Sequence, residues 1–163
     1  MPDGSKRPDL EQAAKKQKID SKAYNELVAN ASMVDIRLTE STFSVKPEYY
    51  ENKDDDLLKY HATRGVSDVS FGEPSSFFHA TVAFEVAVKL GKKKVLSSKA
   101  EYLVVFCSAA DVDKSVVGPY VNKVAVHSAY PYFRQLVASQ SWASETDLPL
   151  LPIIKQKPVK SPD

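Results

Sequence analysis

The sequence is poor in cysteine and glycine and contains no long apolar run, and each absence excludes a class of protein or site. Cys107 is the only cysteine among 163 residues, which excludes an intrachain disulfide and a cysteine-built metal site and fits a reducing compartment. The five glycines form no phosphate-cradling pattern. No apolar run approaches the ~18 residues of a membrane-spanning helix, and the polar N-terminus lacks the apolar core of a secretory signal. We therefore expect a cytoplasmic protein with no membrane insertion.

The charge balance is almost neutral, and the length fits one domain. Lysine and arginine number 22 against 21 acidic residues, so the net charge of +1 gives no basis for nucleic-acid binding. A chain of 163 residues with 43% hydrophobic content can bury one core. We expect a single domain over residues 9–154, with disordered polar tails at 1–8 and 155–163.

The residue types that carry catalysis are present but scattered. His61, His79 and His127 fall in three separate segments, and none has a partner at metal-ligand spacing. The acidic run 54–56 lacks the glycine turn and the distal glutamate of a calcium loop, so it is interpreted as solvated charge. The sequence therefore predicts a protein that is not an enzyme and uses no metal or cofactor.

Periodicity predicts helix, then strands, then helix. A weak helical pattern covers 9–31, with a break near Asp20 left open. Alternation over 34–45 predicts a strand with a bulge that Pro47 ends. The region 59–70 permits a strand but alternates poorly.

The clearest pattern is a long hairpin. Every even position from Phe78 to Leu90 is apolar, and Gly91 with the lysines 92–94 is expected to form the turn. The return strand has one apolar face from Leu96 to Phe106. Its last third is apolar on both sides, and we expect the second side to meet another subunit. The candidate oligomer-interface residues are Leu103, Val105, Val117 and Val121.

After Asp111 the period becomes helical again and continues to about residue 143. Pro131 must kink this helix or start a second one, because proline lacks the N–H and clashes with the preceding turn. Pro149 and Pro152 then predict an extended segment. The expected fold class is α+β: a four-stranded antiparallel sheet with a long kinked C-terminal helix on one face and an extra N-terminal helix.

One combination of motifs resembles a known family. Tyr130-Pro131-Tyr132-Phe133-Arg134, followed by a helix and then Leu148-Pro149-Leu150-Leu151, resembles the signature of the SecB protein-export chaperones. The resemblance covers roughly residues 30–154. It implies an ATP-independent holdase that assembles as a homotetramer, a dimer of dimers. Its apolar grooves would hold unfolded or aggregation-prone polypeptides.

The resemblance also implies which residues line the groove. The loop after the first strand is expected to contribute tyrosines, although pinning that loop to its own sheet is an equally favoured role for them. Trp142 is equally expected to cap the core or to line the groove. The groove candidates are Tyr49, Tyr50, Tyr120, Val124, Tyr132, Phe133, Trp142, Leu148, Leu150 and Leu151.

Departures from the family pattern change the expected client. Glu40 stands where an acidic residue that docks the translocase motor is expected, but Ser44 and Lys99 occupy two other such positions, which puts motor docking in doubt. The end of the chain cannot form the family's lid helix. These changes resemble the SecB-like chaperones associated with toxin–antitoxin systems, so a dedicated client such as an antitoxin is at least as favoured as exported preproteins.

Two other function classes stay open from the sequence. One is a small α+β domain that binds an apolar ligand in a closed cavity. The other is a non-catalytic assembly adaptor. The basic clusters 15–18 and 92–94 are interpreted as solvated surface.

Overall fold

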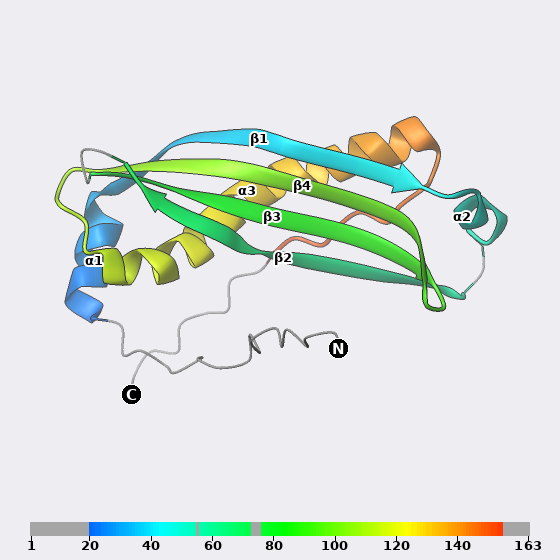
Figure 1. The fold of residues 1–163 in the computed structure, drawn as a ribbon, viewed down its shortest axis with the longest axis horizontal. Helices are drawn as coiled ribbons and strands as arrows, with labels where there is room; N and C mark the ends of the chain where they lie inside the picture. Colours follow the sequence, from blue (N-terminus) through cyan, green and yellow to red (C-terminus); the bar gives the residue numbers. More distant parts are fainter. Residues whose placement is uncertain (1–19, 55, 73–75, 155–163) are drawn as a thin grey trace, which may run out of the picture.

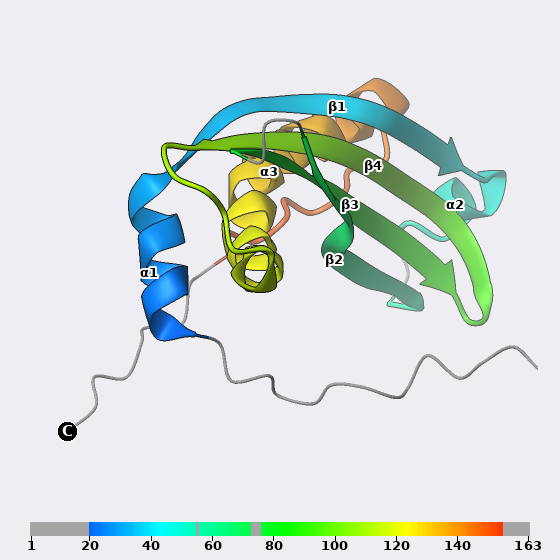
Figure 2. The same ribbon diagram turned by 60° about the vertical axis from the view of Figure 1, so that its left-hand side comes forward.

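The chain folds into one antiparallel sheet covered on one face by a long helix (Figures 1 and 2). The computed structural model describes residues 20–54, 56–72 and 76–154. The strands follow the order β1-β4-β3-β2. The expected α+β class is therefore confirmed. The elements are α1 (Ser21–Asn30), β1 (Ala31–Val45), α2 (Pro47–Glu51), β2 (Leu58–Phe71), β3 (Phe77–Leu90), β4 (Lys93–Ser108) and α3 (Lys114–Ser144).

The β3–β4 hairpin forms the centre of the sheet, as its alternating pattern predicts. The even residues of β3 from Phe78 to Val88 are buried toward α3, because successive side chains of a strand point to opposite faces. Gly91 adopts φ 59° in the turn, a left-handed conformation that favours glycine. The predicted turn is too long, however. Lys93 and Lys94 already belong to β4, and Lys94 donates to Glu85 of β3 at 2.6 Å.

The two edge strands, β1 and β2, carry irregularities. The expected bulge in β1 is confirmed, because its register with β4 shifts between Met33 and Asp35 and again between Leu38 and Glu40. β2 shifts against β3 between Val66 and Asp68. That bulge changes which residues face inward partway along β2, and so explains the poor alternation of its sequence.

Helix α3 lies against the inner face of the sheet and supplies much of the core. Asp113 accepts a hydrogen bond from the Ser115 N–H at 2.9 Å and so caps the helix. The helix continues through Pro131 as one element, so Pro131 does not start a second helix. Figures 1 and 2 show that the helix changes direction along its length. Phe133 stacks on Phe84 of β3 with ring centroids 5.0 Å apart. Stacked rings therefore fill the space between sheet and helix.

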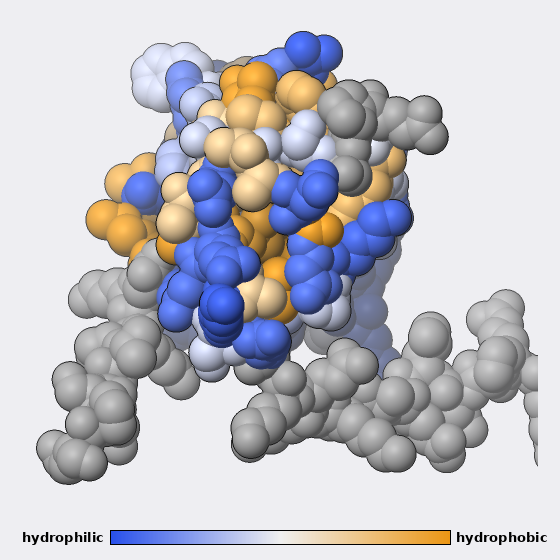
Figure 3. All heavy atoms as spheres, turned by 90° about the vertical axis from the view of Figure 1, so that its left-hand side faces the viewer, coloured by the Kyte–Doolittle hydropathy of each residue, from blue (hydrophilic) through white to orange (hydrophobic). Residues whose placement is uncertain are grey.

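The N-terminal helix is confirmed for α1, which starts at Ser21 with Asp20 as its cap. Residues 9–19 of the expected helix, and both expected tails, lie outside the described residues. Leu27 of α1 is buried against the core. On the surface at this end of the molecule, hydrophilic residues surround smaller apolar areas (Figure 3). Among the helices of the described residues, none has the length and apolar content needed to cross a membrane.

Candidate functional site

The segment that follows α3 is extended and runs back along the helix. The Leu148 N–H donates to Ser141 Oγ at 2.8 Å, and further on Arg134 Nε donates to the Leu151 carbonyl at 2.9 Å. The Tyr130 hydroxyl then donates to the Pro152 carbonyl at 2.7 Å. Later residues of the segment are thus bonded to earlier residues of α3, so the segment runs antiparallel to the helix. The predicted extended conformation after the helix is therefore present.

Apolar side chains on this segment and on the end of α3 are divided between core and solvent. Leu148 and Leu151 are half-buried and pack against the core. Trp142 and Leu150, in contrast, are 87% and 81% exposed. We call Trp142, Leu148, Leu150 and Leu151 the apolar strip. Large exposed apolar groups gathered in one place are typical of an interaction surface.

Two hollows border the apolar strip. One, of about 470 Å³, lies between Trp142 and the segment, and its lining includes Ala138 and Glu145. The other, of about 270 Å³, lies between the segment and β2, where Tyr60 and Ala62 line it. Both hollows include Leu148 and Leu150 in their linings. We call the two hollows together the groove; it is surface-accessible and mostly apolar on the β2 side.

The turn between α3 and the segment is fixed from the crossover loop that carries α2. Thr146 is 1% exposed, and its carbonyl accepts a hydrogen bond from the Tyr49 hydroxyl at 2.5 Å. The Tyr50 hydroxyl donates to the Ser144 carbonyl at 2.6 Å, and Lys53 pairs with Asp147. Burial raises the pKa of Tyr49, so its hydroxyl stays protonated and remains a donor. The crossover loop therefore holds one end of the groove in position.

Comparison with known proteins identifies the architecture. No protein-family model and no curated protein matches the sequence. Among solved structures, the Rv1957 SecB-like chaperone of Mycobacterium tuberculosis, in complex with a ChAD peptide from the Rv1956 HigA1 antitoxin, is similar, with a TM-score of 0.64 and 20% identity over 85% of this chain and 99% of that chain. The chain has a SecB-like fold. A protein of unknown function from Streptococcus agalactiae aligns with a TM-score of 0.37 and 8% identity over 77% of this chain and 97% of that chain.

In this SecB-like fold some of the predicted groove residues are buried, some are half-buried and some are exposed. Tyr49, Tyr120 and Phe133 are buried inside the protomer, so the described surface does not present them. The Tyr49 hydroxyl holds the crossover loop to the turn after α3 through the Thr146 carbonyl, whereas the alternative role expected for it is to pin that loop to its own sheet. Val124 is half-buried. The candidates with large exposed areas are Tyr50, Tyr132, Trp142 and Leu150.

The predicted oligomer-interface residues are also divided. Val117 and Val121 are fully buried under the sheet in the protomer, because the same helical stripe that looked available from the sequence packs against β3 and β4. Leu103 and Val105 alternate with buried residues of β4 and are half-exposed on the sheet face opposite α3. Only these two candidates are thus presented outward.

Sequence reasoning did not select Tyr60 and Ala62 of β2, which line the groove, or Arg64, which follows them on the same strand and is among the residues lining the hollow on the opposite sheet face. Tyr60, Ala62 and Arg64 pair with Val88, Val86 and Phe84, whose side chains face α3. The side chains of all three therefore leave β2 on the face of the sheet that α3 covers, and those of Tyr60 and Ala62 line the groove. Their even spacing is visible in the sequence, but the sequence does not show that the C-terminal segment lies beside them.

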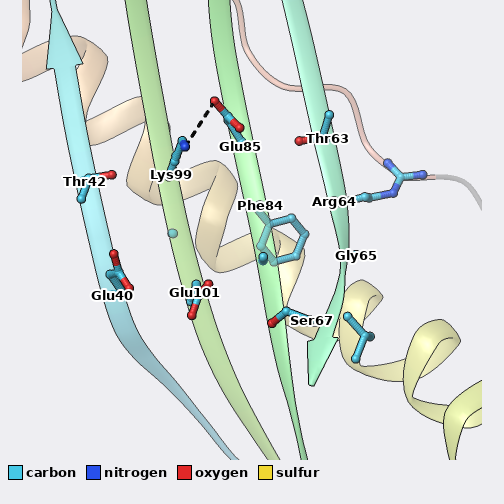
Figure 4. Close-up of a pocket in the computed structure, with 13 residues that line it drawn as sticks. Glu40, Thr42, Thr63, Arg64, Gly65, Ser67, Phe84, Glu85, Lys99 and Glu101 are labelled. Atoms are coloured by element: carbon cyan, nitrogen blue, oxygen red, sulfur yellow. Dashed lines mark ion pairs between the residues drawn. The ribbon is translucent and has the colours of Figure 1, made fainter. Parts of the chain in front are cut away.

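The opposite sheet face carries a separate hollow of about 430 Å³, whose lining includes several charged residues (Figure 4). It opens over the small residues Gly65 and Ala83, which are cross-strand partners. Glu40 lies directly opposite Glu101, and Lys99 is 3.9 Å from Glu85. The charge signs here are therefore mixed. Among the residues that the structure describes, no group of three or more His, Cys, Asp or Glu side chains could hold a metal ion.

Proposed function

We propose that the protein is an ATP-independent chaperone of the holdase type that binds extended apolar stretches of unfolded or aggregation-prone polypeptides. The observation that carries the proposal is the apolar strip beside the groove, where Trp142 and Leu150 are almost fully exposed. Burying one such side chain against a client contributes about 1.5–3 kcal/mol. Binding that removes unfolded chains by mass action requires no nucleotide.

A dedicated client such as an antitoxin is favoured over general protein export. The similar SecB-like chaperone of M. tuberculosis was solved with a peptide of an antitoxin, which supports a polypeptide client of this kind. Lys99 on the outer sheet face pairs with Glu85, so this surface lacks the uniform acidity expected for docking a translocase motor.

The proposal includes a homotetramer that acts in the cytoplasm. Two features support assembly: Leu103 and Val105 are presented on the outer face of β4, and β1 is a long strand at the edge of the sheet. Size-exclusion chromatography with light scattering tests this part. A tetramer has about four times the mass of the 18.0 kDa chain. A stable monomer at micromolar concentration would contradict the assembly without affecting the groove.

The holdase activity is tested by light scattering. The protein is mixed at near-stoichiometric ratio, without ATP, with a chemically unfolded test protein that clouds on dilution. We expect the wild type to slow clouding and the double substitution Trp142→Ser with Leu150→Ser to lose most of this effect. The control is Phe77→Ser, which removes an exposed aromatic at the start of β3 on the opposite sheet face. Equal activity of wild type and double variant would refute the role of the groove.

A further inference from the structure

The groove has a positively charged end. Arg134 lies one turn before Val137 on α3 and borders the contact between the helix and residues Leu150 and Leu151. Arg64 lies on β2 two residues beyond Ala62, which lines the hollow on that side. Because residues two apart on a strand share a face, Arg64 continues the row that borders the groove. Arg134 thus lies on the α3 side beside Leu150 and Leu151, and Arg64 lies on the β2 side, just beyond the residues that line the groove.

The positive charges of both arginines act on the Tyr130 hydroxyl group. The Tyr130 hydroxyl holds the Pro152 carbonyl at this end of the groove. Burial raises the pKa of Tyr130, and the positive charges of Arg134 and Arg64 partly oppose that effect. Figure 4 shows that the Arg64 side chain points outward from the edge of the sheet, although the residue is also among those that line the outer hollow.

Neither arginine is neutralised within the described part of the chain. Ion pairs among residues 20–54, 56–72 and 76–154 join other side chains, and none includes Arg64 or Arg134. Arg134 uses its Nε–H for the Leu151 carbonyl, and the other guanidinium N–H groups can donate to a further acceptor. The sequence after Ile154 adds three lysines and one aspartate.

The opposite end of the groove carries the opposite charge. Glu145 and Asp147 line the hollow beside Trp142. Asp147 is paired with Lys53, whereas no ion pair of the described residues includes Glu145. The apolar strip is therefore flanked by carboxylates at one end and by guanidinium groups at the other.

We propose that Arg64 and Arg134 form a carboxylate-binding subsite at the Pro152 end of the groove, which selects clients with an acidic group next to their apolar anchors. This inference rests on the proposed function. Guanidinium groups suit the subsite because they bind carboxylates through paired N–H donors. The carboxylate can be an acidic side chain or the C-terminus of the client. The charge at the two ends also favours one direction of an extended client over the other.

Fluorescence anisotropy with labelled peptides of one leucine-rich sequence tests the subsite. The first peptide carries two glutamates after the leucines and has an amidated C-terminus. The second carries glutamines in place of the glutamates and is also amidated. The third has the sequence of the second with a free C-terminus. We expect the glutamate peptide to bind about 2–5-fold more tightly than the amidated glutamine peptide at low salt, as is typical of one exposed charge pair. Raising the ionic strength should remove the difference. The third peptide shows whether a terminal carboxylate suffices.

The substitution Arg64→Gln should remove most of the difference in affinity between the glutamate peptide and the amidated glutamine peptide. Lys59→Gln is the matched control, because Lys59 is an exposed cation on the same strand whose cross-strand partner is Lys89, on the opposite sheet face. Equal affinities for both amidated peptides, or discrimination that survives Arg64→Gln, would overturn the subsite while leaving the holdase proposal intact. Failure of every peptide to bind would overturn both proposals.

Discussion

The hydrogen bond from Tyr49 to Thr146 allows a sharp test of how the groove is held. Tyr49→Phe removes only the hydroxyl and keeps the ring in the distal cluster formed by Tyr49, Leu58, Val88, Val95 and Leu96. Both partners of the bond are 1% exposed, so the Thr146 carbonyl would stay buried without a donor. Leaving such a group unsatisfied costs about 1–3 kcal/mol of unfolding free energy.

The neighbouring tyrosine supplies the control. Tyr50 makes a bond of similar length, 2.6 Å, to the Ser144 carbonyl, but its side chain is exposed, so water can replace the lost hydroxyl. Tyr50→Phe should therefore change the unfolding free energy by less than about 0.5 kcal/mol. Both variants remove one hydroxyl from α2 and differ mainly in burial.

Urea unfolding followed by circular dichroism measures the difference. With a dependence on urea of about 2 kcal/mol per M, a loss of 2 kcal/mol lowers the midpoint by about 1 M. Amide hydrogen exchange should also become faster at Leu148, whose N–H is held by Ser141 in the same turn. Equal midpoints for Tyr49→Phe and Tyr50→Phe would refute the argument that burial of this bond stabilises the turn.

Three further predictions concern the helix end, the acid stability and the core. Glu145, at the end of α3, adopts φ 53°, a left-handed conformation that favours glycine, so Glu145→Gly should raise the unfolding free energy by about 0.5–1 kcal/mol. Ser144→Gly, one residue earlier in the helix, should lower it by a similar amount. Thermal unfolding measures both changes. The hydrogen bond from Lys94 lowers the pKa of Glu85. This pair therefore stabilises the fold at a pH above the unfolded-state pKa of glutamate, and the stabilisation is lost as the pH falls through the lowered pKa. Glu85→Gln should flatten this part of the curve of unfolding free energy against pH. Phe133→Ala should cost about 3–5 kcal/mol in urea unfolding, because it leaves a cavity against Phe84.

The sequence predicts the hairpin well because its physical cause is local. The even positions of β3 must all face α3, and alternation of apolar side chains records this directly. β2 was harder to predict for two reasons. It lies at the edge of the sheet, where one side need not be apolar, and its bulge at Val66 shifts the register.

The candidate site was predicted only in part, since a groove and a core require the same side chains. Tyr120 and Phe133 follow the helical spacing that predicts an apolar face, and nothing in that spacing shows whether the face meets the sheet or a client. Trp142 lies on the same helix and is exposed. Long-range packing decides between these outcomes, and a single sequence does not record it.

Arg64 illustrates a different reason why part of the site escaped prediction. Its role depends on the C-terminal segment lying beside β2, although more than 80 residues separate Arg64 from Leu151 in the sequence. Arg134, in contrast, belongs to the motif that carries the family resemblance. The cationic end of the groove therefore combines one residue that sequence comparison selects with one that only the fold selects.

The prolines of the C-terminal segment explain why a groove exists at this position. The segment runs past β2, the last strand of the sheet, and an ordinary extended chain there could add a fifth strand. Pro149 and Pro152 have no N–H to donate, so a regular ladder with β2 is prevented. Hydrogen bonds from Tyr130 and Arg134 instead hold the segment to α3. The space between the segment and β2 therefore stays open, and Tyr60 and Ala62 remain in its wall.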